Sequence, residues 1–301
     1  MYYSSAVFRR KALSVLKGHW QTALLIALVV NLPTLLMQGI SAVTGNDPAS
    51  RLETLFVTAS RDGILTEQLV LDEIRGLLSS TGFWTTKALE LVAWLVTPCL
   101  TLGMYRWVLN RLNGLEDPVG LVFCRTRIFF KAIGLQLLII LKVLAWMLPG
   151  IAVFIAILLP VYQAGTVQEQ AAALQRSYTM TLPAVLLMAV PGAIAALRYA
   201  LAEYIMAEEP SSKILFCIRR SKHLMKDQKK NLFFLMVSFL LWYLLSLLVS
   251  SLVTGVFSLV IQMLASLALS VYMSTSVGAF YLVLEKGKTP EQASDESEEL
   301  N

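Results

Sequence analysis

The sequence predicts an all-α membrane protein: a polytopic bundle of about six transmembrane helices with amphipathic helices at the membrane interface. Of its 301 residues, 56% are hydrophobic and 15% are charged, whereas soluble domains average about 45–50% apolar and about 25% charged residues. The mean hydropathy is +0.66. A soluble domain of this length has too little interior to bury so much apolar surface. The composition therefore excludes a soluble enzyme, a disordered chain and a disulfide-stapled secreted domain.

The first two elements are a short amphipathic helix and a membrane span. Residues 4–17 place Arg10, Ser14 and Lys17 on one face of a helix, which is typical of a helix lying in the membrane interface. The opposite face is formed by Phe8, Ala12, Val15 and Leu16. The apolar run 20–43 is longer than the apolar region of a signal peptide, at about 7–15 residues, so we expect an uncleaved span. Pro33 near its middle predicts a kink.

A polar segment, residues 44–82, separates this span from the second, which we place at about 83–108. The segment carries six acidic residues and three arginines, so we expect an external loop. Within it, residues 66–79 have helical periodicity and predict a short amphipathic helix on the outer surface. Its apolar face would be Val70, Ile74, Leu77 and Leu78.

The apolar region 128–163 is longer than one span of about 20 residues and is interrupted by Pro149-Gly150. It could cross the membrane once or twice. The positive-inside rule favours one crossing, because that places the basic segment 208–230 on the same side as the N-terminus. We therefore expect one crossing with a Pro-Gly break. Residues 164–181 then form a short outer connection, and the fourth span is at about 182–206.

The basic segment and two further spans complete a single membrane domain, residues 1–284. Residues 208–230 predict a cytoplasmic interfacial helix with an apolar stripe of Ile214, Ile218 and Met225. The fifth and sixth spans fall at about 231–254 and 256–284. The tail, residues 285–301, is acidic and polar and is expected to be disordered and cytoplasmic. Six crossings place both termini in the cytoplasm.

Two charged residues inside the spans are the best candidates for a functional pair. Glu90 in the second span and Lys142 in the third are predicted to lie at similar depth. They could form an ion-coupled element or a structural salt bridge, and the structural interpretation is favoured. Glu203, with Tyr199 and Tyr204, is interpreted as part of an interfacial aromatic belt.

The basic residues beside the spans are candidates for contact with anionic lipid of the inner leaflet. Nucleic-acid binding is not expected, because each basic cluster adjoins a membrane-length apolar run. The candidate lipid contacts are Arg9, Arg10, Lys11, Lys17, Arg198, Lys213, Arg219, Arg220, Lys222 and Lys226.

Motifs of common enzymes are absent from the sequence. The three cysteines (Cys99, Cys124, Cys217) and the two histidines (His19, His223) are scattered, so neither a disulfide framework nor a structural metal site is expected. We expect no catalytic residues, no cofactor and no metal.

Two stretches resemble a known family. RRKALSVLKGHWQTALL lies near the N-terminus, and the run from Pro191 to Leu235 combines a Pro-Gly, a Tyr-containing helix, an acidic-Pro break and an R-R-S-x-x-L-M-K helix that leads into a span. Together they resemble the domain-of-unknown-function-975 family of bacterial integral membrane proteins. The resemblance implies a multi-pass protein of the bacterial plasma membrane, and it implies no activity and no catalytic residues.

These observations predict a non-enzymatic accessory or scaffolding protein that binds anionic lipid through its basic helices and a membrane-protein partner through its spans. The alternative is a small transporter or channel, with Pro33 and Pro149-Gly150 breaking helices that line a path. An enzyme acting on lipid is the third and least favoured interpretation.

Overall fold

A computed structural model describes residues 4–44, 78–115, 128–163, 167–252 and 256–286, with isolated positions between them. The described residues are almost all helical and include no strand. Six helices are long and apolar enough to cross a membrane, which confirms the predicted fold class. They are α2 (Trp20–Thr44), α5 (Thr81–Leu112), α6 (Phe129–Gln163), α7 (Val167–Tyr199) with its continuation α8 (Ala202–Glu208), α10 (Lys229–Ser251) and α11 (Val256–Lys286).

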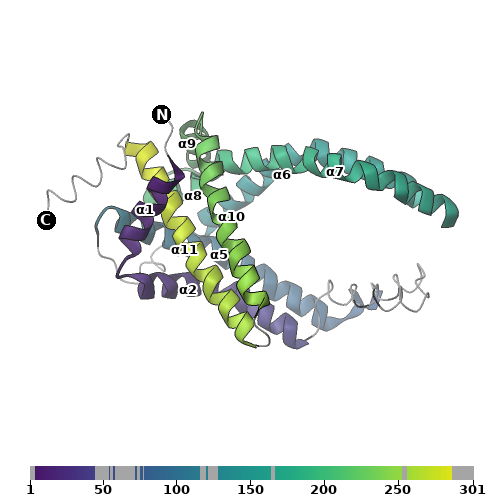
Figure 1. The fold of residues 1–301 in the computed structure, drawn as a ribbon, viewed down its shortest axis with the longest axis horizontal. Helices are drawn as coiled ribbons and strands as arrows, with labels where there is room; N and C mark the ends of the chain where they lie inside the picture. Colours follow the sequence, from purple (N-terminus) through teal and green to yellow (C-terminus); the bar gives the residue numbers. More distant parts are fainter. Residues whose placement is uncertain are drawn as a thin grey trace.

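The six helices meet in a base at one end of the molecule and diverge from it (Figure 1). Helix α11 is central and packs against α10, α5, α2 and a short N-terminal helix, α1 (Ser5–Leu16). In its span 61% of the residues are buried, against 6% in the span of α6. The base therefore holds the hydrophobic core, and the far ends of the helices present apolar side chains outward, as lipid-facing surfaces do.

Helices α6 and α7 form a long antiparallel hairpin that projects from the base (Figure 1), and we call it the arm. Two expectations are corrected here. Helix α6 continues through Pro149-Gly150 without a break, and α7 already begins at Val167, inside the expected outer connection 164–181. Close packing explains the first difference, since Gly150 lies directly against the backbone of Met188 and α7 supports α6 there. The Ala- and Gln-rich sequence of 167–176 explains the second, because these residues favour helix.

The fourth span contains the only break in a membrane-length helical run of the described chain. Helix α7 ends at Tyr199, and a turn at Ala200 and Leu201 leads into α8. Helix α2, by contrast, runs through Pro33. The break was not predicted, because no proline or glycine marks it.

The two predicted interfacial helices are present, and both pack on protein. Phe8, Ala12 and Leu16 of α1 are buried, and Phe8 meets Phe280 of α11 edge to face at 5.3 Å. Helix α9 (Ile214–Leu224) buries Ile218 of the predicted stripe, with Met225 beyond its end. The external-loop helix expected at 66–79 lies mostly outside the described residues, and the tail from 287 lies wholly outside them.

Candidate functional site

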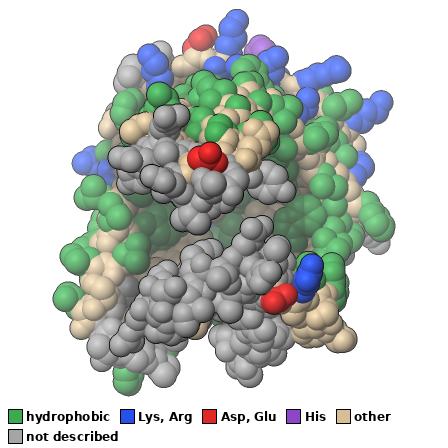
Figure 2. All heavy atoms as spheres, turned by 90° about the vertical axis from the view of Figure 1, so that its right-hand side faces the viewer, with side chains coloured by type: hydrophobic (Ala, Val, Ile, Leu, Met, Phe, Trp, Pro, Cys, Tyr) green, Lys and Arg blue, Asp and Glu red, His purple; other side chains and the backbone are tan. Residues whose placement is uncertain are grey.

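The candidate site is at the base of the bundle and has two parts. The first is a basic face formed by α1, α9 and the residues that flank them. Figure 2 shows lysine and arginine side chains along the upper edge of the molecule, the level at which Figure 1 places α9. The second is a cluster of tyrosine and glutamate side chains beneath it. Each part is built by residues from several helices.

Six of the ten predicted lipid-contact cations are exposed on this face. They are Arg10, Lys17, Lys213, Arg219, Lys222 and Lys226. The remaining four (Arg9, Lys11, Arg198, Arg220) are half-buried. Within the described residues, Arg220 is the only one of the ten that forms an ion pair, between its Nη2 and Oε1 of Glu285 at 2.6 Å. The hydrogen bond and charge of Glu285 raise the pKa of Arg220. The pair ties α9 to the end of α11 and leaves the other cations available.

Arg198 lies apart from this face, on the arm. Its guanidinium is 5.1 Å from the ring centroid of Trp146 on α6, a cation–π distance. Its backbone oxygen accepts a hydrogen bond from Ser221 of α9 at 3.1 Å. Arg198 therefore joins the arm to the base through its backbone and meets α6 with its side chain.

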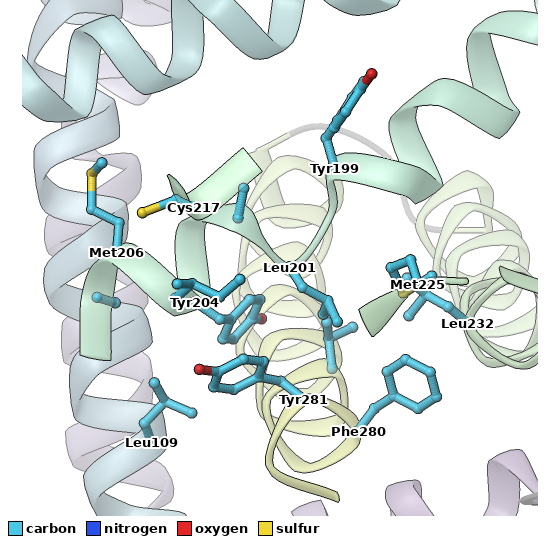
Figure 3. Close-up of a cluster of buried hydrophobic side chains, with 14 of the residues drawn as sticks. Leu109, Tyr199, Leu201, Tyr204, Met206, Cys217, Met225, Leu232, Phe280 and Tyr281 are labelled. Atoms are coloured by element: carbon cyan, nitrogen blue, oxygen red, sulfur yellow. The ribbon is translucent and has the colours of Figure 1, made fainter. Parts of the chain in front are cut away.

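Three stacked tyrosines form the centre of the buried cluster. Tyr204 of α8 stacks on Tyr105 of α5, with ring centroids 4.2 Å apart, and on Tyr281 of α11 at 6.1 Å. The Tyr204 hydroxyl donates to the Ser274 backbone oxygen at 2.9 Å, and the Tyr281 hydroxyl donates to Oε2 of Glu208 at 2.5 Å. Figure 3 shows Tyr204 and Tyr281 side by side. Buried hydroxyls that are paired in this way fix helices in one arrangement.

The burial of Tyr199 and Tyr204 corrects the interpretation that they belong to an interfacial aromatic belt. Tyr199 is 7% exposed and Tyr204 is 3% exposed, so both belong to the protein core. Helix α8 turns away from α7 at Leu201 and thereby carries Tyr204 inward between α5 and α11. No periodicity in the sequence indicates such a turn.

Cations from two helices hold the connection between α8 and α9. Lys131 of α6 donates to the backbone oxygens of Pro210 and Ser211 at 3.2 and 3.3 Å. Arg106 of α5 donates to the backbone oxygen of Glu208 at 3.4 Å. These bonds satisfy the carbonyl of Glu208 at the end of α8 and two carbonyls of the connection that follows it. The connection is therefore fixed to α5 and α6.

The predicted pair of Glu90 and Lys142 is not formed. Glu90 instead pairs with Lys87 one turn away on α5, at 2.7 Å between Nζ and Oε2. Lys142 lies on α6, which contacts α5 near the base and then diverges from it in the arm (Figure 1). The two charges lie on separate helices that diverge, because α6 tilts away from α5.

The described cysteines and acids do not assemble a metal site: no group of three or more such ligands occurs among the described residues. Cys217 is fully buried in the base. Burial raises the pKa of its thiol to about 11. At neutral pH this thiol is protonated, so it packs as a small apolar group.

The arrangement separates two roles. In the tyrosine–glutamate cluster the hydroxyls of Tyr204 and Tyr281 are paired within the protein, and these bonds tie α8 to α11. The exposed cations of α1 and α9 have no acidic partner within the described chain and can attract an anionic surface. Sequence reasoning identified the cations but missed Tyr105, Tyr281 and Glu208, which were hidden within apolar or charged runs.

Comparison with known proteins gives one match. The sequence model of a family described as "Protein of unknown function (DUF975)" matches residues 1–288. No curated protein matches the chain, and no solved structure matches it.

Proposed function

Since the chain belongs to the DUF975 family, a family of unknown function with membrane-length helices in this member, we propose its role from the structure. The protein is a non-enzymatic accessory or scaffolding protein of the plasma membrane. Its basic face binds anionic lipid of the inner leaflet, and its arm binds a membrane-protein partner.

The basic face is the main support for the proposed lipid binding. Helices α1 and α9 are far apart in the sequence, yet both lie at the base of the bundle (Figure 1), and both carry exposed cations. Each Lys or Arg near an anionic membrane surface contributes about 1 kcal/mol of attraction. The Glu285 carboxylate is used by Arg220, and the described part of the face offers few other acids. The face is therefore suited to phospholipid headgroups.

The arm supports the second half of the proposal. Only 6% of its α6 span is buried, and its contacts with the bundle outside the arm are near the base. On α7 the small residues Ala189, Ala193 and Ala196 are exposed. In a membrane, small residues allow a partner helix to approach closely. A transmembrane helix of another protein is the chemistry that fits this surface.

The transporter alternative has less support. It was based on helix breaks at Pro33 and Pro149-Gly150, and α2 and α6 are continuous at both. Apart from these positions, the break at Ala200–Leu201 is filled by buried side chains of the base, including Tyr199 and Leu201. If vesicles that contain the protein and vesicles that lack it take up solutes at the same rate, the scaffolding role is supported.

The lipid half of the proposal is tested by charge removal on α9. The double change Arg219→Gln and Lys222→Gln is expected to weaken the binding of phosphatidylglycerol to the basic face about 30-fold, because about 2 kcal/mol of attraction is lost there. Native mass spectrometry of the purified protein, titrated with phosphatidylglycerol or phosphatidylcholine, measures the number of lipids retained.

A matched control removes two charges from the other end of the molecule. The change Arg75→Gln with Lys87→Gln takes two cations that are paired with Asp72 and Glu90, and it should leave lipid retention unchanged. Equal loss in both double variants, or equal retention of the two lipids by the unchanged protein, would contradict the proposal.

A further inference from the structure

The two helices of the arm have matching stretches without charge. Helix α6 carries no charged residue from Val143 to Gln163, and α7 carries none from Ser177 to Leu197. Each stretch has 21 residues. At about 1.5 Å per residue each is about 31 Å long, close to the hydrocarbon thickness of about 30 Å. The arm can thus span the hydrocarbon core with these two stretches alone.

The stretches are in register across the hairpin. A Cβ atom on Gly150 would lie 2.4 Å from the Met188 Cα, and one on Gly192 would lie 2.8 Å from the Met147 Cγ. From Gly150 to Lys142 is about 12 Å along α6, and from Met188 to Arg198 is about 15 Å along α7. Lys142 and Arg198 therefore stand at the same level. That level is the base-proximal edge of both uncharged stretches.

Trp146 connects these two cations. It lies one turn from Lys142 on the same face of α6, and Arg198 lies over its ring at 5.1 Å. Its side chain is 47% exposed. Tryptophan at the end of an uncharged stretch is typical of the headgroup level of a membrane. Two cations and an aromatic ring are thus gathered at the depth of lipid phosphates.

Neither cation has an acidic partner in the part of the chain that the structure describes. Glu90, the carboxylate predicted for Lys142, is used by Lys87. Arg198 makes its side-chain contact with an aromatic ring, which does not neutralise its charge. Two cations at one level, half-buried and without acids, require an anion or water. At the edge of the hydrocarbon, the anion at hand is a lipid phosphate.

We propose that Lys142, Trp146 and Arg198 form a site for the phosphate headgroup of one anionic phospholipid, whose acyl chains lie along the arm. The inference rests on the proposed lipid binding and names a discrete site within it. Lys142 and Arg198 donate to the phosphate oxygens, and Trp146 supports the guanidinium and contacts the glycerol region. This site is distinct from the diffuse attraction of α1 and α9, because it lies on the flank of the bundle.

The affinity of the full-length protein for its first bound phosphatidylglycerol tests the site. Lys142→Gln and Arg198→Gln are each expected to lower this affinity about tenfold, the effect of one lost charge-assisted hydrogen bond. Lys87→Gln is the control, with the same substitution at the far end of α5. The double variant on α9 should instead reduce the number of weakly bound lipids and leave the first unaffected.

A second measurement uses the unchanged protein and requires no variant to fold. Photoactivatable phosphatidylglycerol should label peptides containing residues 142–150 or 193–198. Inorganic phosphate should not displace the lipid, because it lacks acyl chains. Displacement by phosphate would replace the lipid by a free anion and overturn the proposal. If the lipid binds but labels only other peptides, the site is overturned and the proposed function stands. If the unchanged protein shows no preference for phosphatidylglycerol over phosphatidylcholine, the proposed function is overturned as well.

Discussion

Gly150→Ala is expected to destabilise the arm by about 3 kcal/mol, at the upper end of overpacking costs. A Cβ atom at this position would lie 2.4 Å from the Met188 Cα and 2.5 Å from the Met188 backbone nitrogen. Backbone atoms of a packed helix cannot turn aside, so α6 and α7 must separate. The midpoint of thermal unfolding in detergent measures the effect.

Gly192→Ala is the matched control, in the partner helix of the same hairpin. Its added Cβ would meet the Met147 side chain, with the Cγ at 2.8 Å and the Sδ at 3.1 Å. A methionine side chain can adopt another rotamer. We expect a loss well below that of Gly150→Ala. Equal losses in the two variants would show that the helices do not approach at Gly150 as described.

Phe8→Ala is expected to cost about 3–5 kcal/mol, the usual range for removing a buried aromatic side chain. Phe8 is 1% exposed and packs edge to face on Phe280 of α11. Its removal should release α1 from the bundle. Two measurements detect this release. The midpoint of thermal unfolding should fall, and protease should cut the chain within residues 5–16.

Leu13→Ala serves as the control for Phe8, because it is on the same helix and 44% exposed. Its truncation should leave both the midpoint and the protease resistance close to those of the unchanged protein. If Leu13→Ala and Phe8→Ala behave alike, α1 lies in the membrane interface as the sequence alone suggested, and its contact with α11 contributes no stability.

The spans were the most predictable part of the fold. The expected bounds 20–43, 231–254 and 256–284 differ from α2, α10 and α11 by at most three residues. A long apolar run in a membrane must be helical, because a helix is the only single-segment structure that forms all of its backbone hydrogen bonds internally. Pattern and structure agree wherever this constraint acts alone.

The arm shows where the pattern was insufficient. Pro149-Gly150 signals a break in isolation, but the neighbouring α7 packs on Gly150 and keeps α6 continuous. The break after Tyr199 arises for the opposite reason: tertiary contacts of Tyr204 with Tyr105 and Tyr281 hold α8 in the base. Both outcomes depend on residues distant in sequence.

The candidate site was predictable in its charges and not in its partners. The exposed cations of α9 follow from the positive-inside pattern. That Arg220 would pair with Glu285, that Lys131 would bond the Pro210 carbonyl, or that Glu90 would choose Lys87 over Lys142 depends on how the helices tilt. A shift of a few ångströms between helices decides which side chains can reach one another, and the sequence pattern does not give that shift.

We propose that the basic face lies on the inner side of the membrane, and the proposed lipid binding depends on this orientation. It is tested most directly by labelling two single-cysteine chains, in which Cys99, Cys124 and Cys217 are replaced by serine. One carries Lys222→Cys on α9 and the other Gln163→Cys at the tip of the arm, both exposed positions. A membrane-impermeant maleimide applied to intact cells should label the Gln163→Cys chain, and the Lys222→Cys chain only after the membrane is permeabilised. Labelling of Lys222→Cys in intact cells would contradict the account.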